Sequence, residues 1–126
     1  MNECVLDASA VLAILQNERG REMVEARIER SVIGRINFVE ILTTLVNKGM
    51  LLDAAIEALD SLDLTVIELD RAQSIRIAEL RPLTRHLGLS LGDRACLALA
   101  IGENATAVTA DRNWVGTDVC QIESIR

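Results

Sequence analysis

The stretch C-V-L-D-A-S-A-V-L-A-I-L, residues 4–15, decides the fold. It passes from a short apolar run through one acid, Asp7, into a second apolar run. Strands of a parallel sheet are covered on both faces and are therefore apolar without alternation. We predict a buried strand that ends at Asp7 and a helix that starts just beyond it. Asp7 would then lie at the carboxyl end of the strand, where open α/β sheets bind ligands. The structural alternative is that Asp7 or Ser9 only caps the helix.

The composition suits helices packed on a parallel sheet. A chain of 126 residues can bury a real core, and we predict a single domain over residues 1–126. Half of the residues are apolar, but only Phe38 and Trp114 are aromatic, so the core must be built from Leu, Ile, Val and Ala. The formal net charge of −6 argues against a domain that grips nucleic acid by a basic surface. It does not exclude a nuclease, because a cation-binding carboxylate cluster is itself negative.

The cysteines and the N-terminus bear on the compartment. Cys4, Cys96 and Cys120 lie in apolar runs without a C-x-x-C pair, so we expect reduced core thiols rather than a disulfide frame or a zinc site. The first residues lack the basic and apolar regions of a signal peptide. No apolar run approaches the ~20 residues of a membrane span. These features predict a cytoplasmic protein with no membrane partner.

Helices and strands alternate along the rest of the chain, which favours a three-layer α/β domain with a mainly parallel sheet. Proline cannot continue a helix interior, so Pro82 is expected to end one helix. The apolar stripe of the first charged helix can face its own core or a partner. The strands are expected at 32–33, 64–69, 106–109 and 119–122, and the helices at 21–30, 36–48, 51–62, 71–80 and 89–102.

Four acids lie at the ends of these elements with no basic residue obviously paired to them. Asp7 and Asp111 follow strands, Asp93 opens a helix, and Glu40 lies one turn inside another helix. Each has a plain structural alternative: a cap for Asp7, an exposed stripe for Glu40, a capping box with Ser90 for Asp93 and a turn for Asp111. In a doubly wound sheet, however, such positions converge near one crevice.

Four carboxylates in one crevice would repel one another unless a cation joined them. Hard oxygen ligands of this kind select Mg²⁺ or Mn²⁺. One or two such ions lower the pKa of a bound water, orient it for in-line attack and stabilise the leaving oxygen. The chemistry indicated is hydrolysis of phosphodiester bonds.

Four segments of the chain resemble the PIN-domain nucleases, and especially the VapC-type toxins of bacterial toxin–antitoxin pairs. They are V-L-D-A-S-A at the start, N-F-V-E in the third helix, L-S-L-G-D-R-A-C-L-A-L-A near residue 93 and T-A-D-R-N-W after the fourth strand. Each motif is weak alone, but the ordered set with these spacings is specific and covers nearly the whole chain. The resemblance implies that Asp7, Glu40, Asp93 and Asp111 form the acidic quartet that holds Mg²⁺.

The same resemblance assigns supporting positions. Ser9 and Asn37 match polar residues that support the site, and Thr109 matches a residue that braces the last acid. The fourth acid varies most in this family, so Asp118 is the alternative to Asp111.

Two arginines flank these acids. Arg94 and Arg112 could hold RNA phosphates or an antitoxin carboxylate by charge-assisted hydrogen bonds. The alternative is that they only balance local acids.

The resemblance also implies a PIN-like α/β/α fold, an endoribonuclease that cleaves single-stranded RNA to 5′-phosphate products, a homodimer, and inhibition by a cognate antitoxin protein. The rival hypothesis is a PIN-like module that binds RNA or protein without cutting, and the complete quartet speaks against it. A dehalogenase-type phosphotransferase would need a second Asp where this chain has Ser9, and a receiver domain would need a late lysine where Lys48 is the only one.

Overall fold

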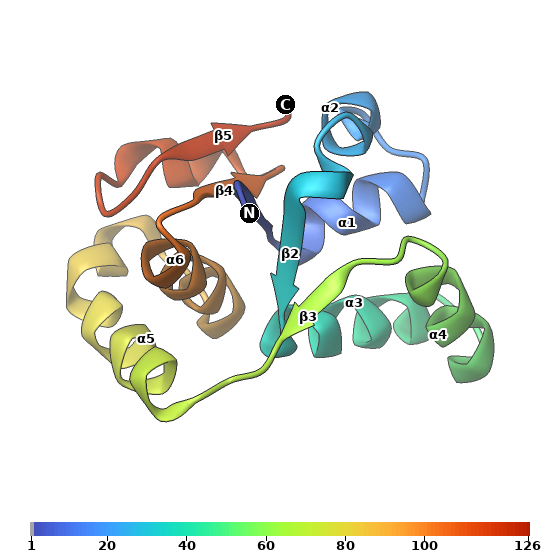
Figure 1. Ribbon diagram of the computed structural model, residues 1–126, viewed down its shortest axis with the longest axis horizontal. Helices are drawn as coiled ribbons and strands as arrows, with labels where there is room; N and C mark the ends of the chain where they lie inside the picture. The colour runs from blue at the N-terminus through green and yellow to red at the C-terminus, as the bar shows by residue number, and fades with distance from the viewer. Residues whose placement is uncertain (1) are drawn as a thin grey trace.

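A central sheet of five parallel strands organises the computed structural model, which describes residues 2–126 (Figure 1). The order across the sheet is β3-β2-β1-β4-β5. The predicted first strand is therefore central, and it pairs with β2 on one side and β4 on the other. The strands are β1 (Cys4–Leu6), β2 (Ser31–Gly34), β3 (Thr65–Ile67), β4 (Thr106–Thr109) and β5 (Ile122–Ser124).

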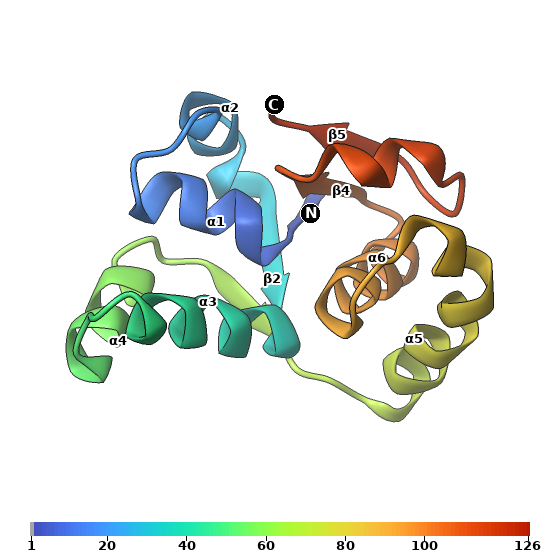
Figure 2. The same ribbon diagram turned by 180° about the vertical axis from the view of Figure 1, so that it is seen from behind.

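Helices cover both faces of the sheet, and Figures 1 and 2 show the two layers from opposite sides. Val5 of β1 packs into the core under α5 and α6, whereas its neighbour Leu6 packs into the core under α1 to α4. This confirms the predicted three-layer α/β/α domain with a parallel sheet. The helices are α1 (Ala8–Leu15), α2 (Arg21–Glu25), α3 (Arg35–Asn47), α4 (Leu52–Asp60), α5 (Arg71–Thr84) and α6 (Leu91–Glu103), with 3₁₀ turns η1 (Ile28–Arg30), η2 (Arg85–Leu87) and η3 (Arg112–Gly116).

Most predicted elements lie within two residues of the observed ones, but the helix predicted over 21–30 does not. α2 ends at Glu25, and the chain then turns through η1 into β2. Val24 is the one fully buried residue of the predicted stripe, and it packs on the protein's own core. In the segment after it, Arg27 forms an ion pair with Glu123 of β5 at 2.6 Å.

The prediction that Pro82 ends a helix was wrong, because α5 runs through it to Thr84. Pro82 lies in the last turn, where its missing N–H removes only one helical bond. The Leu80 carbonyl near it accepts a hydrogen bond of 2.7 Å from the Thr84 hydroxyl, which helps to hold this turn.

The last strand was predicted too early, at 119–122. It is Ile122–Ser124, paired with β4 so that Ala107 lies beside Ile122. β5 is an edge strand whose residues are all half-buried. Its mixed apolar and polar residues predict a strand less clearly than the apolar run before it does. No helix among residues 2–126 is long and apolar enough to cross a membrane.

Candidate metal centre

Asp7 is buried at the carboxyl end of the central strand. Only 4% of it is exposed, and it caps α1 by accepting a hydrogen bond of 2.9 Å from the Ala10 amide. The same oxygen, Oδ1, accepts from the Ser9 hydroxyl at 2.7 Å, and Oδ2 accepts from the Thr109 hydroxyl at 2.9 Å. Burial raises the pKa of Asp7 from 3.8 to about 6, although these three hydrogen bonds act against the rise. Asp7 is thus both the N-cap of α1 and an acid at the carboxyl edge of the sheet, so the two sequence interpretations hold at once.

Two hydroxyls tie the end of β4 to the start of α1. Ser9 Oγ lies 3.3 Å from Thr109 Oγ1 and accepts from the Ala110 amide at 2.9 Å. Thr109 Oγ1 accepts from the Asp111 amide at 3.0 Å while it donates to Asp7. A single hydroxyl therefore connects the backbone of Asp111 to the Asp7 carboxylate.

The carboxylate of Asp111 caps η3 by accepting from the Asn113 amide at 2.9 Å. The alternative acid, Asp118, is exposed in the segment before β5. Among residues 2–126, no hydrogen bond joins Asp118 to the network around Asp7. The backbone amide of Asp111 is therefore part of the network around Asp7, whereas its carboxylate is hydrogen-bonded to Asn113.

Glu40 comes from α3, which begins directly after β2, and its carboxylate is half-buried. The buried Asn37 donates one amide nitrogen, Nδ2, both to Glu40 Oε1 at 2.9 Å and to the Gly92 carbonyl at 3.2 Å. Burial raises the pKa of Glu40, the Asn37 amide lowers it, and the charge of Asp93 raises it further. Glu40 is therefore not a plain surface acid.

Asp93 forms the predicted capping box with Ser90. Ser90 donates its amide to Asp93 Oδ2 at 2.9 Å, and its hydroxyl accepts from the Asp93 amide at 3.2 Å. This structural role does not remove Asp93 from the site, since its charge raises the pKa of both Asp7 and Glu40. Asp93 thus lies within electrostatic reach of both Asp7 and Glu40.

None of the four candidate acids is paired with a basic side chain within residues 2–126. The ion pairs formed within residues 2–126 involve Glu3, Glu18, Glu25, Glu68 and Glu123, and none of the four candidate acids. Burying a carboxylate without a cationic partner is expensive. The acids are consequently candidates for a function rather than for structural ion pairs.

The carboxylates are nevertheless not gathered around one point. Among residues 2–126, no group of three acidic, histidine or cysteine side chains is close enough to hold a metal ion. Glu40 and Asp93 are held by donors close to them in the sequence, and Asp7 is held by donors from α1 and from β4. Their chemistry still fits Mg²⁺ or Mn²⁺, because carboxylate and amide oxygens are the ligands these ions prefer. Asn37 adds to this fit, since its Oδ1 is buried and has no partner within the described chain.

The two flanking arginines differ. Arg94 reaches from α6 to α5, where its Nη1 donates to the Ile77 carbonyl at 2.9 Å, and its buried Nε has no partner among the described residues. Arg112 begins η3 next to Asp111 and is exposed. Of the two arginines, Arg112 is therefore the one that a ligand could reach from solvent.

Sequence reasoning passed over Gly92. This residue lies against Glu40, as described below. The available signal was a glycine in the first turn of an otherwise apolar helix, where alanine would be the better helix former.

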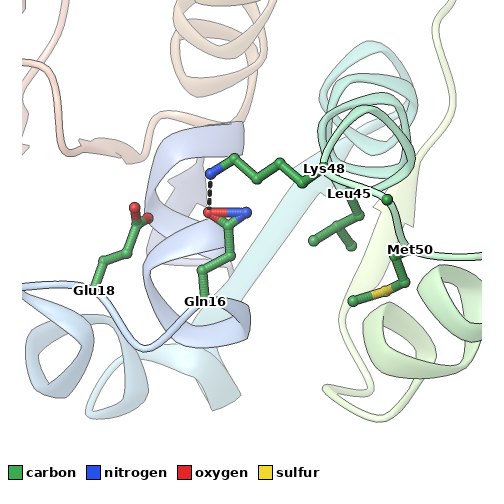
Figure 3. Close-up of a pocket in the computed structure, with 6 residues that line it drawn as sticks. Gln16, Glu18, Leu45, Lys48 and Met50 are labelled. Atoms are coloured by element: carbon green, nitrogen blue, oxygen red, sulfur yellow. Dashed lines mark hydrogen bonds between the residues drawn. The ribbon is translucent and has the colours of Figure 1, made fainter.

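A surface cavity of about 610 Å³ lies at the C-terminal ends of α1 and α3, and none of the four acids lines it. Figure 3 shows Lys48 reaching across from α3 to Gln16, with Nζ donating to Oε1 at 2.7 Å. A second cavity, of about 310 Å³, lies along α3 and α4 and is largely apolar. It is lined by Val39, Leu42, Thr43, Val46, Asn47 and Leu52.

The sequence profile of the PIN domain matches residues 4–119. The chain belongs to the PIN domain family. Its fold is similar to that of a chain in the DNA-bound VapBC from Salmonella typhimurium, with a TM-score of 0.80 and 19% identity over 100% of both chains. It is also similar to a chain in a toxin-antitoxin complex from Klebsiella pneumoniae, with a TM-score of 0.76 and 17% identity over 98% of each chain.

The fold is also similar to that of a chain in VapBC2 from Rickettsia felis, bound to a DNA fragment from the VapBC2 promoter. It aligns with a TM-score of 0.75 and 20% identity over 96% of this chain and 97% of that one. No curated protein sequence matches the chain. The family predicted from the four sequence segments is therefore confirmed by the sequence profile. The structural comparisons, at 17–20% identity, show a shared fold and nothing more.

Proposed function

We propose that this PIN-domain protein is a Mg²⁺-dependent endoribonuclease and the toxin of a toxin–antitoxin pair. The observation that carries the proposal is the buried Asp7 at the carboxyl end of the central strand, which forms no ion pair within residues 2–126 and lies, like Glu40, within electrostatic reach of Asp93. Membership of the PIN domain family supports nuclease chemistry. The toxin-antitoxin complexes among the structures of the same fold support a cognate antitoxin as partner.

In this mechanism Asp7, Glu40, Asp93 and Asp111 are the residues that would hold the cation. A bound Mg²⁺ would lower the pKa of a water for attack on a phosphodiester and balance the charge on the leaving oxygen. Ser9 and Thr109 fix the Asp7 carboxylate, as described above.

The remaining side chains orient the site and the substrate. Asn37 holds the Glu40 carboxylate beside α6. The exposed guanidinium of Arg112 contacts a backbone phosphate of the RNA by charge-assisted hydrogen bonds. Arg94 braces α6 on α5 through the Ile77 carbonyl, so Asp93 is kept in place.

The proposed partners are an RNA substrate, the antitoxin and a second copy of the chain, in the cytoplasm. Exposed apolar side chains on α3 and α4, including Val39, Val46 and Leu52, border the cavity of about 310 Å³ and support protein contacts on that face.

A PIN-like module that binds without cutting is the second candidate. The observation in its favour is that no three candidate ligands within residues 2–126 are gathered around one point. The two functions differ in whether Mg²⁺ produces cleavage.

The deciding experiment is an RNA cleavage assay with the purified chain, freed of partner and of metal. Structured RNAs with single-stranded loops are incubated with Mg²⁺ or with EDTA, and the ends are mapped. The proposal predicts 5′-phosphate ends that appear only with Mg²⁺ and are lost in Asp93→Asn. Absence of both cleavage and Mg²⁺ binding by calorimetry would favour the binding module.

A further inference from the structure

Gly92 lies against the Glu40 carboxylate in the first turn of α6. Its φ is not in the left-handed region, which is occupied by Gly20, Gly49 and Gly88 instead. Backbone freedom is therefore not the reason for a glycine at this position. A Cβ atom on Gly92 would overlap Oε1, Cδ and Oε2 of Glu40, that is, the whole carboxylate group. The carboxylate occupies the space that a side chain at position 92 would fill.

A buried amide holds the carboxylate in this space. Asn37 Nδ2 donates to Glu40 Oε1 at 2.9 Å and to the Gly92 carbonyl at 3.2 Å. Asn37 is only 1% exposed, so it has little freedom to follow Glu40 elsewhere. Glu40 from α3 is thus placed against the turn of α6 that carries Asp93.

Helix stability alone would favour alanine at position 92, because glycine is the poorer helix former. The same helix offers a comparison in Gly102. A Cβ there would meet only the guanidinium end of Arg76, at 3.0 Å from Nη1. Both positions accommodate a methyl group if a long side chain swings aside, but only at Gly92 does that side chain belong to the acidic site.

We propose that Gly92 is a positioning residue of the acidic site: the absence of a side chain at this position lets the Glu40 carboxylate rest against the first turn of α6, next to Asp93. The inference rests on the proposed metal-dependent function. It explains why a weak helix former lies in the first turn of α6. It also means that cation binding would depend on a residue that has no ligand atoms of its own.

The test is a double-mutant cycle with two readouts. Mg²⁺ and Mn²⁺ binding is measured by calorimetry for the wild type, Gly92→Ala, Glu40→Ala and the double variant, with Gly102→Ala as the matched control. We expect Gly92→Ala to weaken cation binding by ~10–100-fold, as loss of an orienting contact does at metal sites. Its melting temperature should be equal to or above that of the wild type, because Glu40 can swing into solvent.

In the double variant, Gly92→Ala should add nothing to the loss caused by Glu40→Ala, and Gly102→Ala should bind like the wild type. Binding by Gly92→Ala within twofold of the wild type would overturn the inference, as would losses that add in the double variant.

The second readout needs no cation. The side-chain amide resonance of Asn37, measured by NMR in EDTA, should move in Gly92→Ala and in Glu40→Ala alike and stay in place in Gly102→Ala. If the wild type binds neither cation, the proposed metal function fails, and this resonance alone decides the role of Gly92. An unmoved Asn37 amide in Gly92→Ala would then refute it.

Discussion

Replacement of Asp7 by Asn should stabilise the metal-free protein at neutral pH. Burial holds the pKa of this carboxyl at about 6, against 3.8 for the free group. At ~1.4 kcal/mol for each pH unit, ionising Asp7 in the folded state costs about 3 kcal/mol. Asn is uncharged, close in shape to the protonated acid and an equally good N-cap. It can keep the hydrogen bonds from the Ala10 amide and the Ser9 hydroxyl.

The gain should depend on pH in one direction. Because the folded pKa of Asp7 lies above the unfolded value, its favourable contribution is complete below about pH 3.8 and is lost as the pH rises through about 6. The wild type should therefore match Asp7→Asn near pH 4. It should be less stable by about 3 kcal/mol at pH 7, an order-of-magnitude figure from the same pKa difference.

Urea unfolding in EDTA at pH 4, 5.5 and 7 measures this difference. The control is Asp70→Asn, because Asp70 also caps a helix, by accepting from the Gln73 amide at 2.8 Å, but is exposed. The control should change the free energy of unfolding by no more than about 0.5 kcal/mol, as surface substitutions do. An Asp7→Asn variant no more stable than the wild type at pH 7, or a gain that persists at pH 4, would refute the reasoning.

Three further predictions concern the same network. Mg²⁺ should raise the melting temperature of the wild type and not that of Asp7→Asn, which thermal unfolding with and without the ion checks; an equal rise in both would remove Asp7 from the site. Thr109→Val removes the donor to Asp7 and the acceptor for the Asp111 amide, so urea unfolding should show a loss of about 1–3 kcal/mol, whereas Thr109→Ser should lose much less. Asp111→Asn should abolish RNA cleavage and Asp118→Asn should not, and the reverse result in the cleavage assay would make Asp118 the fourth acid.

Short stretches of sequence predicted those parts of the structure that depend on contacts between neighbouring residues. The apolar run before Asp7 predicted β1, and Ser90 with Asp93 predicted a capping box, because strand burial and helix caps are read from neighbouring residues. Asp7, Glu40, Asp93 and Asp111 were expected together, since the sheet edge collects the ends of its elements. In the structure the charge of Asp93 raises the pKa of both Asp7 and Glu40.

The features that depend on distant contacts were not predictable in this way. Edge strand β5 is fixed by its register with β4 and not by its own apolar content. The contact of Gly92 with Glu40 joins two helices that are far apart in the sequence, so a single chain without its fold gives no sign of it. The Asp7 carboxylate is likewise held in part by the Thr109 hydroxyl, which comes from β4, 102 residues further along the chain.

Lys48 is the sole lysine of the chain, and it spans the cavity between the ends of α1 and α3 by its hydrogen bond to Gln16. Amine-directed reagents therefore find a single side-chain target on the protein, in a cavity that none of the four candidate acids lines. The rate at which a fluorophore or an acetyl group is attached to Lys48 would report whether this cavity is occupied. Any molecule that fills the cavity would shield the amine and slow its labelling, while ligands at the acidic site would leave the rate unchanged.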